Sequence, residues 1–245
     1  MKHKQRFYPE SRIAGFSNID GTLAFYNQVN ALLHPDDTVL DVGCGRGAYG
    51  DDPIPYRRQR RILKGKVARV IGIDVDPAGN SNPYIDEFRP ITGARWPIDN
   101  GSIDLCLADN VLEHVEDPPT FFAECQRVVK TGGWACIRTP NIRSYFGLAA
   151  RLTPKNKQLT VLDKAKERLN PADTFPTLYR CNTLGCVRRM LASHGFEPVV
   201  YGYESEPGYL SFSGLFYFLG VLYQRLVPER FKVGIHAFGK RMPEA

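Results

Sequence analysis

The sequence lacks the features of a secreted protein and those of a protein with a structural metal site. Its first ten residues, MKHKQRFYPE, contain no hydrophobic core of a signal peptide. None of its six cysteines forms a C-x-x-C pair, and Cys181 and Cys186 have no His or Cys neighbour at metal-ligand spacing. No internal repeat and no low-complexity tract is present. We therefore expect a cytoplasmic protein with mostly buried free thiols, without a disulfide framework and without a metal.

The composition is that of an ordinary globular protein. The chain has 245 residues, of which 43% are hydrophobic and 24% charged, enough for one well-packed α/β domain with additions. The formal net charge of +6 permits an anionic partner but does not identify one.

Short β-rich runs alternate with helical stretches along the chain. The two clear helices are residues 119–130, ending at Thr131-Gly132-Gly133, and residues 182–196, with Asn182 as N-cap and Gly195 as the stop. This alternation predicts a parallel sheet with helices on both faces. The predicted strands are TVLDVG (38–43), ARVIGID (68–74), SIDLCLAD (102–109), WACIRT (134–139), PVVYGY (198–203) and VGIHAFG (233–239).

A glycine-rich loop follows the first predicted strand, in the stretch VLDVGCGRGAYGDDP (39–53). Gly43, Gly45 and Ala48 match the G-x-G-x-x-G/A pattern of dinucleotide-binding proteins, which lets a ligand approach bare backbone. However, Asp41 stands two residues before the first glycine. A carboxylate there suits a ligand with an ammonium or sulfonium charge and repels a pyrophosphate.

Two further features separate this loop from a dinucleotide site. The second predicted strand ends at Asp74, an acid placed to bind ribose hydroxyls at the switch point of the sheet. Pro53 and Pro55 interrupt the helix whose N-terminus would hold a phosphate. The residues therefore predict a site for a cationic, ribose-bearing ligand.

Several motifs in this order resemble the class I S-adenosylmethionine-dependent methyltransferases, in particular the methyltransferase type 11/12-like group. They are DVGCGRG, VIGIDVD, WPIDNGSIDLCLADNVLEHVEDP (96–118) and IRTPN (137–141). The resemblance spans roughly residues 36–142, with a return at 182–203. It implies an α/β, Rossmann-like, doubly wound, seven-stranded and mostly parallel sheet with an antiparallel last strand, plus helical insertions.

The resemblance also implies S-adenosyl-L-methionine as cofactor and assigns its contacts. Asp41 and the glycines would line its methionine end, Asp74 would bind the ribose, and Asp109 and Asn110 would lie beside it at the end of the fourth strand. Thr92 stands where the family often has an acid, and Trp96 where it has a leucine, so we expect backbone groups or ring packing to recognise adenine. The implied cofactor-binding residues are Asp41, Gly43, Cys44, Gly45, Gly47, Asp74, Val75, Thr92, Gly93, Asp109 and Asn110.

Two histidines and one basic run leave alternatives open. His114, in LEHV, is either a general base or a structural histidine that holds its loop. His194, before Gly195, is expected to cap a helix. The run YRRQRRILKGK (56–66) is interpreted as a solvated face, with an anionic substrate, a lipid surface or nucleic acid as the alternatives.

Two segments do not fit the alternation of strands and helices. Residues 143–181 are mixed and basic, and residues 207–224 contain no charge. The uncharged stretch is barely long enough to span a membrane, so it predicts either a lid or an interfacial helix in peripheral contact with the inner face of the membrane. We expect one methyltransferase domain over residues 1–245, with its core at about 20–142 and 182–203, its last strand at about 232–240, and acceptor-covering insertions at 143–181 and 204–231.

The predicted reaction is methylation of a sugar hydroxyl, on a glycan or a lipid-linked intermediate, or of a small metabolite. The alternatives are an aromatic or quinone-like acceptor, a nucleic-acid-binding methyltransferase, and a cofactor-binding module without catalysis. A dehydrogenase is the least favoured, and nucleic acid is the disfavoured partner. The sequence carries no motif that identifies the acceptor or the oligomeric state.

Overall fold

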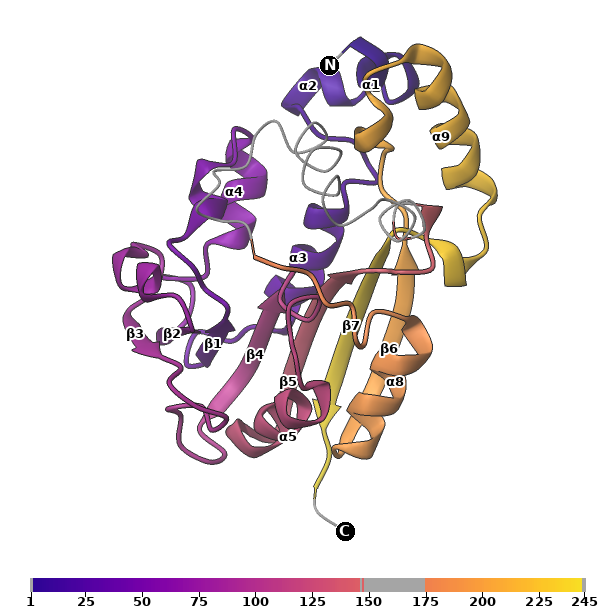
Figure 1. Ribbon diagram of the computed structural model, residues 1–245. Helices are drawn as coiled ribbons and strands as arrows, with labels where there is room; N and C mark the ends of the chain where they lie inside the picture. The colour runs from indigo at the N-terminus through magenta and orange to yellow at the C-terminus, as the bar shows by residue number, and fades with distance from the viewer. Residues whose placement is uncertain (1, 146, 148–174, 244–245) are drawn as a thin grey trace.

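The computed structural model describes residues 2–145, 147 and 175–243 as an α/β fold around a single seven-stranded sheet (Figure 1). The strands are β1 (Thr38–Val42), β2 (Arg69–Asp74), β3 (Glu87–Pro90), β4 (Ile103–Asp109), β5 (Val129–Pro140), β6 (Phe196–Tyr203) and β7 (Gly234–Arg241). Their order is β3-β2-β1-β4-β5-β7-β6, in which β7 runs antiparallel to both of its neighbours. The predicted fold class is confirmed, although β3 was not among the strands located from the sequence.

Helices lie on both faces of the sheet and beyond the ends of its strands. Among the described residues they are α1 (Lys2–Phe7), α2 (Ser11–Ala14), α3 (Gly21–Leu32), α4 (Pro55–Arg61), α5 (Pro118–Val128), α8 (Leu184–Ser193) and α9 (Gly214–Leu226). Short 3-10 helices are η1 (Ala48–Asp51), η2 (Pro77–Ser81), η4 (Gly208–Leu210) and η5 (Glu229–Phe231). Helices α5 and α8 pack on one face, and α3 packs on the other.

The alternation of side chains along β1 decides what each face receives. Leu40 and Val42 point into the larger core, which α5 and α8 close with residues such as Phe122 and Leu191. Val39 points into the second core, beneath α3. Asp41, two residues after Val39, points to the same α3 face. Its carboxylate therefore lies next to the second core, near the end of β1.

Several local predictions need correction. Thr183, not Asn182, caps α8, because its side chain accepts from Cys186 N, while Asn182 Nδ2 donates to Thr139 Oγ1 (2.6 Å). Helix α5 ends at Val128, and Thr131-Gly132-Gly133 lies within β5 at a register irregularity.

The region after the glycine loop departs from expectation in one respect. The chain there forms only the short η1, as the prolines predicted, but Pro55 then begins α4 instead of preventing a helix. Asp20 joins this helix to α3, because it caps α3 and also pairs with Arg57 of α4 (2.8 Å). After the glycine loop, the chain thus forms the short η1 and then a short basic helix, α4, which Asp20 anchors to α3.

The predicted helix stop at Gly195 is confirmed by its positive φ of 73°. His194 also acts as predicted, since its Nδ1 donates to the Met190 carbonyl oxygen (2.7 Å) at the end of α8. Trp96, in the place of a leucine, is buried in the core against Phe121 with ring centroids 5.5 Å apart. All six cysteines are free, and five are buried.

Candidate functional site

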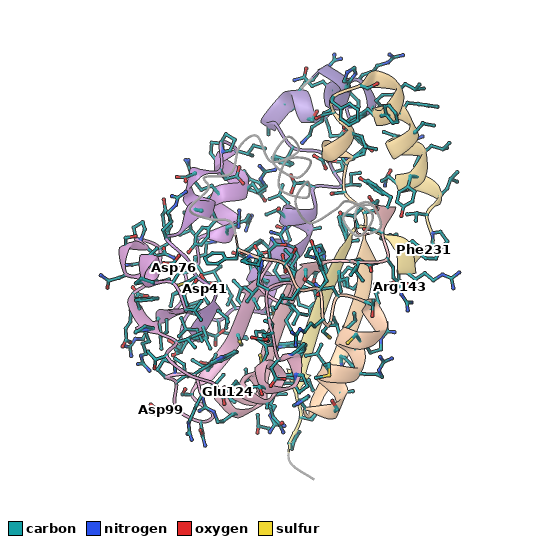
Figure 2. All side chains as sticks on the ribbon, viewed as in Figure 1. Asp41, Asp76, Asp99, Glu124, Arg143 and Phe231 are labelled. Atoms are coloured by element: carbon teal, nitrogen blue, oxygen red, sulfur yellow. The ribbon has the colours of Figure 1, made fainter. Side chains whose placement is uncertain are left out.

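The candidate site lies where β1, β2 and β4 end. The strand order places β1 between β2 and β4, so Asp41, Asp74 and Asp109 come together at one edge of the sheet. This is the topological switch point at which open α/β sheets bind their ligands. Asp41 is marked at the end of β1 in Figure 2.

The glycine loop is packed at its ends and open at its middle. Gly43 and Gly47 have φ of 68° and 79°, and a Cβ would lie 2.6 Å from Val111 Cγ2 at Gly43 and 2.5 Å from Asn82 Oδ1 at Gly47. Gly45 also has a positive φ, of 47°, but a Cβ there would meet no atom within 4 Å. Among the described residues, nothing therefore blocks the close approach of a ligand to the bare backbone of Gly45.

Asp74 ties the loop to the end of β2. One carboxylate oxygen accepts from Gly45 N (2.8 Å), and the other accepts from Asp76 N (2.9 Å). The side chain is buried, yet each oxygen keeps a further lone pair. Asp74 thus both shapes the loop and retains the capacity to accept from ribose hydroxyls.

Asp41 is the acid without a partner. Among the residues that the structure describes, no hydrogen bond to its carboxylate is found. Burial and the neighbouring charge of Asp109 raise its pKa to about 7, against the opposing charge of Arg61. Asp41 lines a small cavity with Tyr26, Tyr49 and Arg61. A ligand that brings a positive charge to this cavity would stabilise the carboxylate.

Asp109 is held very differently, although it lies on the same face of the sheet. Its two oxygens accept from Arg138 Nε (2.6 Å) and Nη2 (2.8 Å), and Tyr26 donates to it as well (2.9 Å). Burial acts to raise the pKa of Asp109, but the charges of Arg138 and Arg61 outweigh it and hold the pKa below its usual value. Asp109 ends β4, the fourth strand, as predicted, and its carboxylate is already bound by Arg138 and Tyr26, while its predicted place beside the cofactor stays a prediction.

Arg61 and Arg138 are site residues that sequence reasoning missed. Arg61 comes from the run interpreted as a solvated face, yet it turns inward, 3.4 Å from Asp109 and over the rings of Tyr26 and Tyr49. That interpretation is also wrong for Arg57, which pairs with Asp52 and Asp20. Arg138 could have been found, because it lies two residues after the buried Cys136, on the same face of the strand that pairs with β4 at Asp109.

The other implied contacts fall around the same edge. Cys44 points its thiol toward Gly72 in the interior, so only its backbone faces the loop. Val75 is 70% exposed beyond Asp74, and Thr92 and Gly93 are exposed after β3. Asn110 has a positive φ of 57°, an unusual conformation held by its N–H to the Arg138 carbonyl oxygen (2.8 Å). Their contacts with a cofactor stay predictions.

His114 lies beyond the end of β4, in contact with the segment at Pro176. Its Nδ1 is 2.8 Å from the Pro176 carbonyl oxygen, which can only accept, so Nδ1 carries the proton and Nε2 the lone pair in the neutral ring. The preceding Glu113 is buried, accepts from Thr139 Oγ1 (2.9 Å), and has its pKa raised to about 7 by burial. The predicted acceptor insertion lies largely outside the described residues, which omit 148–174.

The described residues contain no cluster of His, Cys, Asp or Glu arranged to hold a metal ion. They do fit S-adenosylmethionine on two structural grounds. The unpartnered Asp41 carboxylate suits a positively charged group, and the open side of Gly45 accommodates close approach of a ligand to the backbone. Asp74 lies on the neighbouring strand with spare acceptor capacity for ribose.

Comparisons with known proteins agree with this geometry. Residues 40–137 match the protein family described as a methyltransferase domain. A probable S-adenosylmethionine-dependent methyltransferase of Mycolicibacterium smegmatis is 34% identical over 108 residues, covering 42% of this chain and 38% of the relative. A ubiquinone biosynthesis O-methyltransferase of Burkholderia thailandensis is 30% identical over 125 residues, covering 49% of this chain and 53% of the relative. The chain thus spans less than two thirds of these relatives' length.

Solved structures share the fold over nearly the whole chain. A Haloferax volcanii putative methyltransferase, solved with the Trm112 methyltransferase activator, has a TM-score of 0.60 at 16% identity, covering 92% of both chains. The geranyl diphosphate C-methyltransferase of Streptomyces coelicolor, solved with S-adenosyl-L-homocysteine, has a TM-score of 0.56 at 16% identity, covering 91% of this chain and 79% of that one. At this identity the likeness concerns the fold.

The sheet order, the site geometry and the matched family together define the class. The fold is that of the Rossmann-like class I methyltransferases. Residues 40–137 match a methyltransferase domain, and the geometry of the site fits S-adenosylmethionine as the cofactor.

Proposed function

We propose that the protein transfers a methyl group from S-adenosylmethionine to a hydroxyl oxygen. The favoured acceptor is a sugar hydroxyl on a glycan or a lipid-linked intermediate, or the hydroxyl of a small metabolite. The observation that carries the donor half of this proposal is the Asp41 carboxylate, which has no hydrogen-bond partner among the described residues and lies beside the open glycine backbone. A half-buried acid is costly to ionise without a compensating charge, and a cationic donor would supply one.

When bound, S-adenosylmethionine supplies a methyl group on a positively charged sulfur, and its leaving thioether departs neutral. The protein therefore needs no acid for the leaving group and must chiefly hold the acceptor oxygen close to the methyl carbon. Asp41 and Asp74 would hold the donor, which would supply its methyl group to the acceptor oxygen, and a hydroxyl acceptor would give up its proton. His114 is our candidate for the general base that accepts this proton. Its hydrogen bond from Nδ1 to Pro176 places the lone pair of the neutral ring on Nε2.

Two observations support an oxygen acceptor. The first is this tautomer of His114, since a base aids hydroxyl methylation in particular. The second is the function of the Burkholderia thailandensis relative, an O-methyltransferase of ubiquinone biosynthesis. That relative also favours a second candidate acceptor for this chain, an aromatic or quinone-like hydroxyl.

The donor half is tested by calorimetry with S-adenosylhomocysteine and with NAD. We expect S-adenosylhomocysteine to bind and NAD not to bind, and Asp41→Ala and Asp74→Ala to weaken binding about 100-fold while circular dichroism stays unchanged. Undiminished affinity in both variants would refute the site. The acceptor half is tested by transfer of a labelled methyl group to sugar, lipid-linked sugar and phenolic panels, with the position of the label read by mass spectrometry.

A further inference from the structure

Helix α9 turns apolar side chains to the solvent. Seven large hydrophobic residues in and just before the helix are between 45% and 72% exposed. We call them the apolar α9 face: Phe212, Leu215, Phe216, Phe218, Leu219, Leu222 and Leu226. An aromatic side chain of this kind carries roughly 150–250 Å² of surface, so even half exposed they exceed the few hundred Å² usual for one patch.

Packing on the opposite side fixes the direction of this face. Tyr217 and Val221 are buried against Tyr8 next to α1, and a Cβ at Gly220 would lie 2.6 Å from Pro207. The ring of Phe7 stacks on Tyr217, with centroids 5.7 Å apart. Because one side of α9 is already filled in this way, the apolar α9 face points away from the molecule, as the projecting side chains in Figure 2 show.

The place of α9 in the fold relates it to the cofactor site. The helix lies between β6 and β7, and β6 runs in the same direction as β1 and β4. It therefore stands beyond the edge of the sheet at which the glycine loop lies, together with α1 and α2 (Figure 1). Among the described residues, no helix is long and apolar enough to cross a membrane.

The charges around the apolar α9 face are predominantly positive. Helix α9 contains Arg225 and no acidic residue, and Arg225 is exposed. Arg6 is also exposed and lies 5.7 Å over the ring of Phe7, which is itself 6.2 Å from the ring of Phe218. Arg230 is exposed just after the helix, beside the exposed Glu229.

We propose that the apolar α9 face binds the surface of an anionic phospholipid bilayer, with the helix lying in the interface. The phenylalanines and leucines would enter roughly 5–10 Å into the boundary between headgroups and acyl chains. The arginines at its border would remain at the level of the lipid phosphates, which favours an anionic over a neutral membrane. This proposal concerns the membrane alone and stands whichever hydroxyl the protein methylates.

The test is co-sedimentation of the full chain with vesicles that contain no acceptor. Vesicles of phosphatidylcholine alone are compared with vesicles of phosphatidylcholine and phosphatidylglycerol. We expect binding to the anionic vesicles, at least a tenfold loss of affinity in the Leu219→Glu/Leu222→Glu variant, and loss of the anionic preference in Arg225→Gln/Arg230→Gln. Circular dichroism and S-adenosylhomocysteine affinity should be unchanged in both variants, which separates this test from that of the proposed function.

Met242→Glu is the matched control, because Met242 is 42% exposed, close to the 45% of Leu222, but lies near the chain end opposite to α9 (Figure 1). It should bind vesicles like the unaltered protein. The proposal is overturned if anionic vesicles do not bind, or if the two leucine substitutions leave binding unchanged. It is also overturned if light scattering shows a dimer that these substitutions dissociate, since a second copy would then cover the face.

Discussion

Asp41 and Asp109 lie on neighbouring strands and face the same side of the sheet, but only Asp109 has arginines bound to it. Arg61 lines the cavity with Asp41, yet its ion pair is with Asp109. The protein thus neutralises one carboxylate internally and leaves the other to a ligand. From this asymmetry we infer that Asp109 supports the site and that Asp41 is the acid that would recognise a positive charge.

The Asp41 carboxylate makes cofactor affinity depend on pH. Its pKa of about 7 means that the charged form grows between pH 6 and pH 7.5, so S-adenosylhomocysteine should bind about tenfold more tightly at the higher pH. Calorimetry at the two pH values measures this, and Asp41→Asn should bind weakly with no such slope. A slope that persists in Asp41→Asn would assign the titration to another group.

The same substitution should stabilise the protein without ligand. Because the pKa of Asp41 is raised above its unfolded value of 3.8, the folded state binds the proton more tightly, and the free energy of unfolding falls as pH rises from about 4 to about 7. Asp41→Asn removes that loss, so we expect a gain of about 1–2 kcal/mol at about pH 8 and little change at about pH 4. Urea unfolding at both pH values measures it. Equal stability of the two proteins at the higher pH would contradict the burial argument.

Gly45 is predicted to be required by the ligand more than by the fold. Its φ of 47° makes Gly45→Ala cost about 1 kcal/mol of stability, but no protein atom obstructs the new methyl group. Gly101 is a matched control, with φ of 55° and no atom within 4 Å of its Cβ position, at the opposite end of β4. Both alanine variants should melt similarly, while only Gly45→Ala loses S-adenosylhomocysteine affinity. Equal affinity in the two variants would place the ligand elsewhere.

Removing the partner of Asp109 should be far more damaging than removing an exposed ion pair. Arg138→Met leaves the buried Asp109 carboxylate with much less compensating charge, and we expect a loss of about 3–5 kcal/mol in the free energy of unfolding. Lys130→Met, which breaks the more exposed pair with Asp104 (2.8 Å), should cost about 0–1 kcal/mol. Urea titration compares them. In Arg138→Met/Asp109→Leu much of the loss should be recovered, because both charges of the buried Arg138–Asp109 pair are removed together.

The roles of the two ring nitrogens of His114 can be tested separately by substitution. His114→Asn places an amide donor near the position of Nδ1, which keeps the hydrogen bond to Pro176 but removes Nε2. If Nε2 takes the acceptor proton, turnover falls about 100-fold or more with melting temperature and S-adenosylhomocysteine affinity retained. His194→Asn, at the remote end of α8, is the control with unchanged turnover. A variant that melts lower but turns over normally would make His114 structural.

The sequence by itself determined the sheet and the chemistry of its edge. Alternating apolar runs require strands buried between helices, which is why six strands and two helices were located, and the order Asp41, glycines, Asp74 indicates a cationic ribose-bearing ligand. The strand β3 was not predicted because it is only four residues long and carries the ion pair of Glu87 and Arg89. The cap of α8 was not predicted correctly either, since Asn182 and Thr183 are both suitable caps by residue type. Only the hydrogen bond from Asn182 to Thr139 shows that Asn182 is used elsewhere.

Only the tertiary structure decided which charges are paired and which apolar residues are exposed. Arg61 and Arg138 reach Asp109 from segments 48 and 29 residues away in the sequence, so no local pattern reveals that Asp109 is neutralised and Asp41 is not. The uncharged stretch at 207–224 likewise contains both the buried and the exposed apolar residues of α9, and the sequence does not tell them apart. Which side is buried depends on α1 at the far end of the chain, because a helix chooses its inner side by the partner against which it packs.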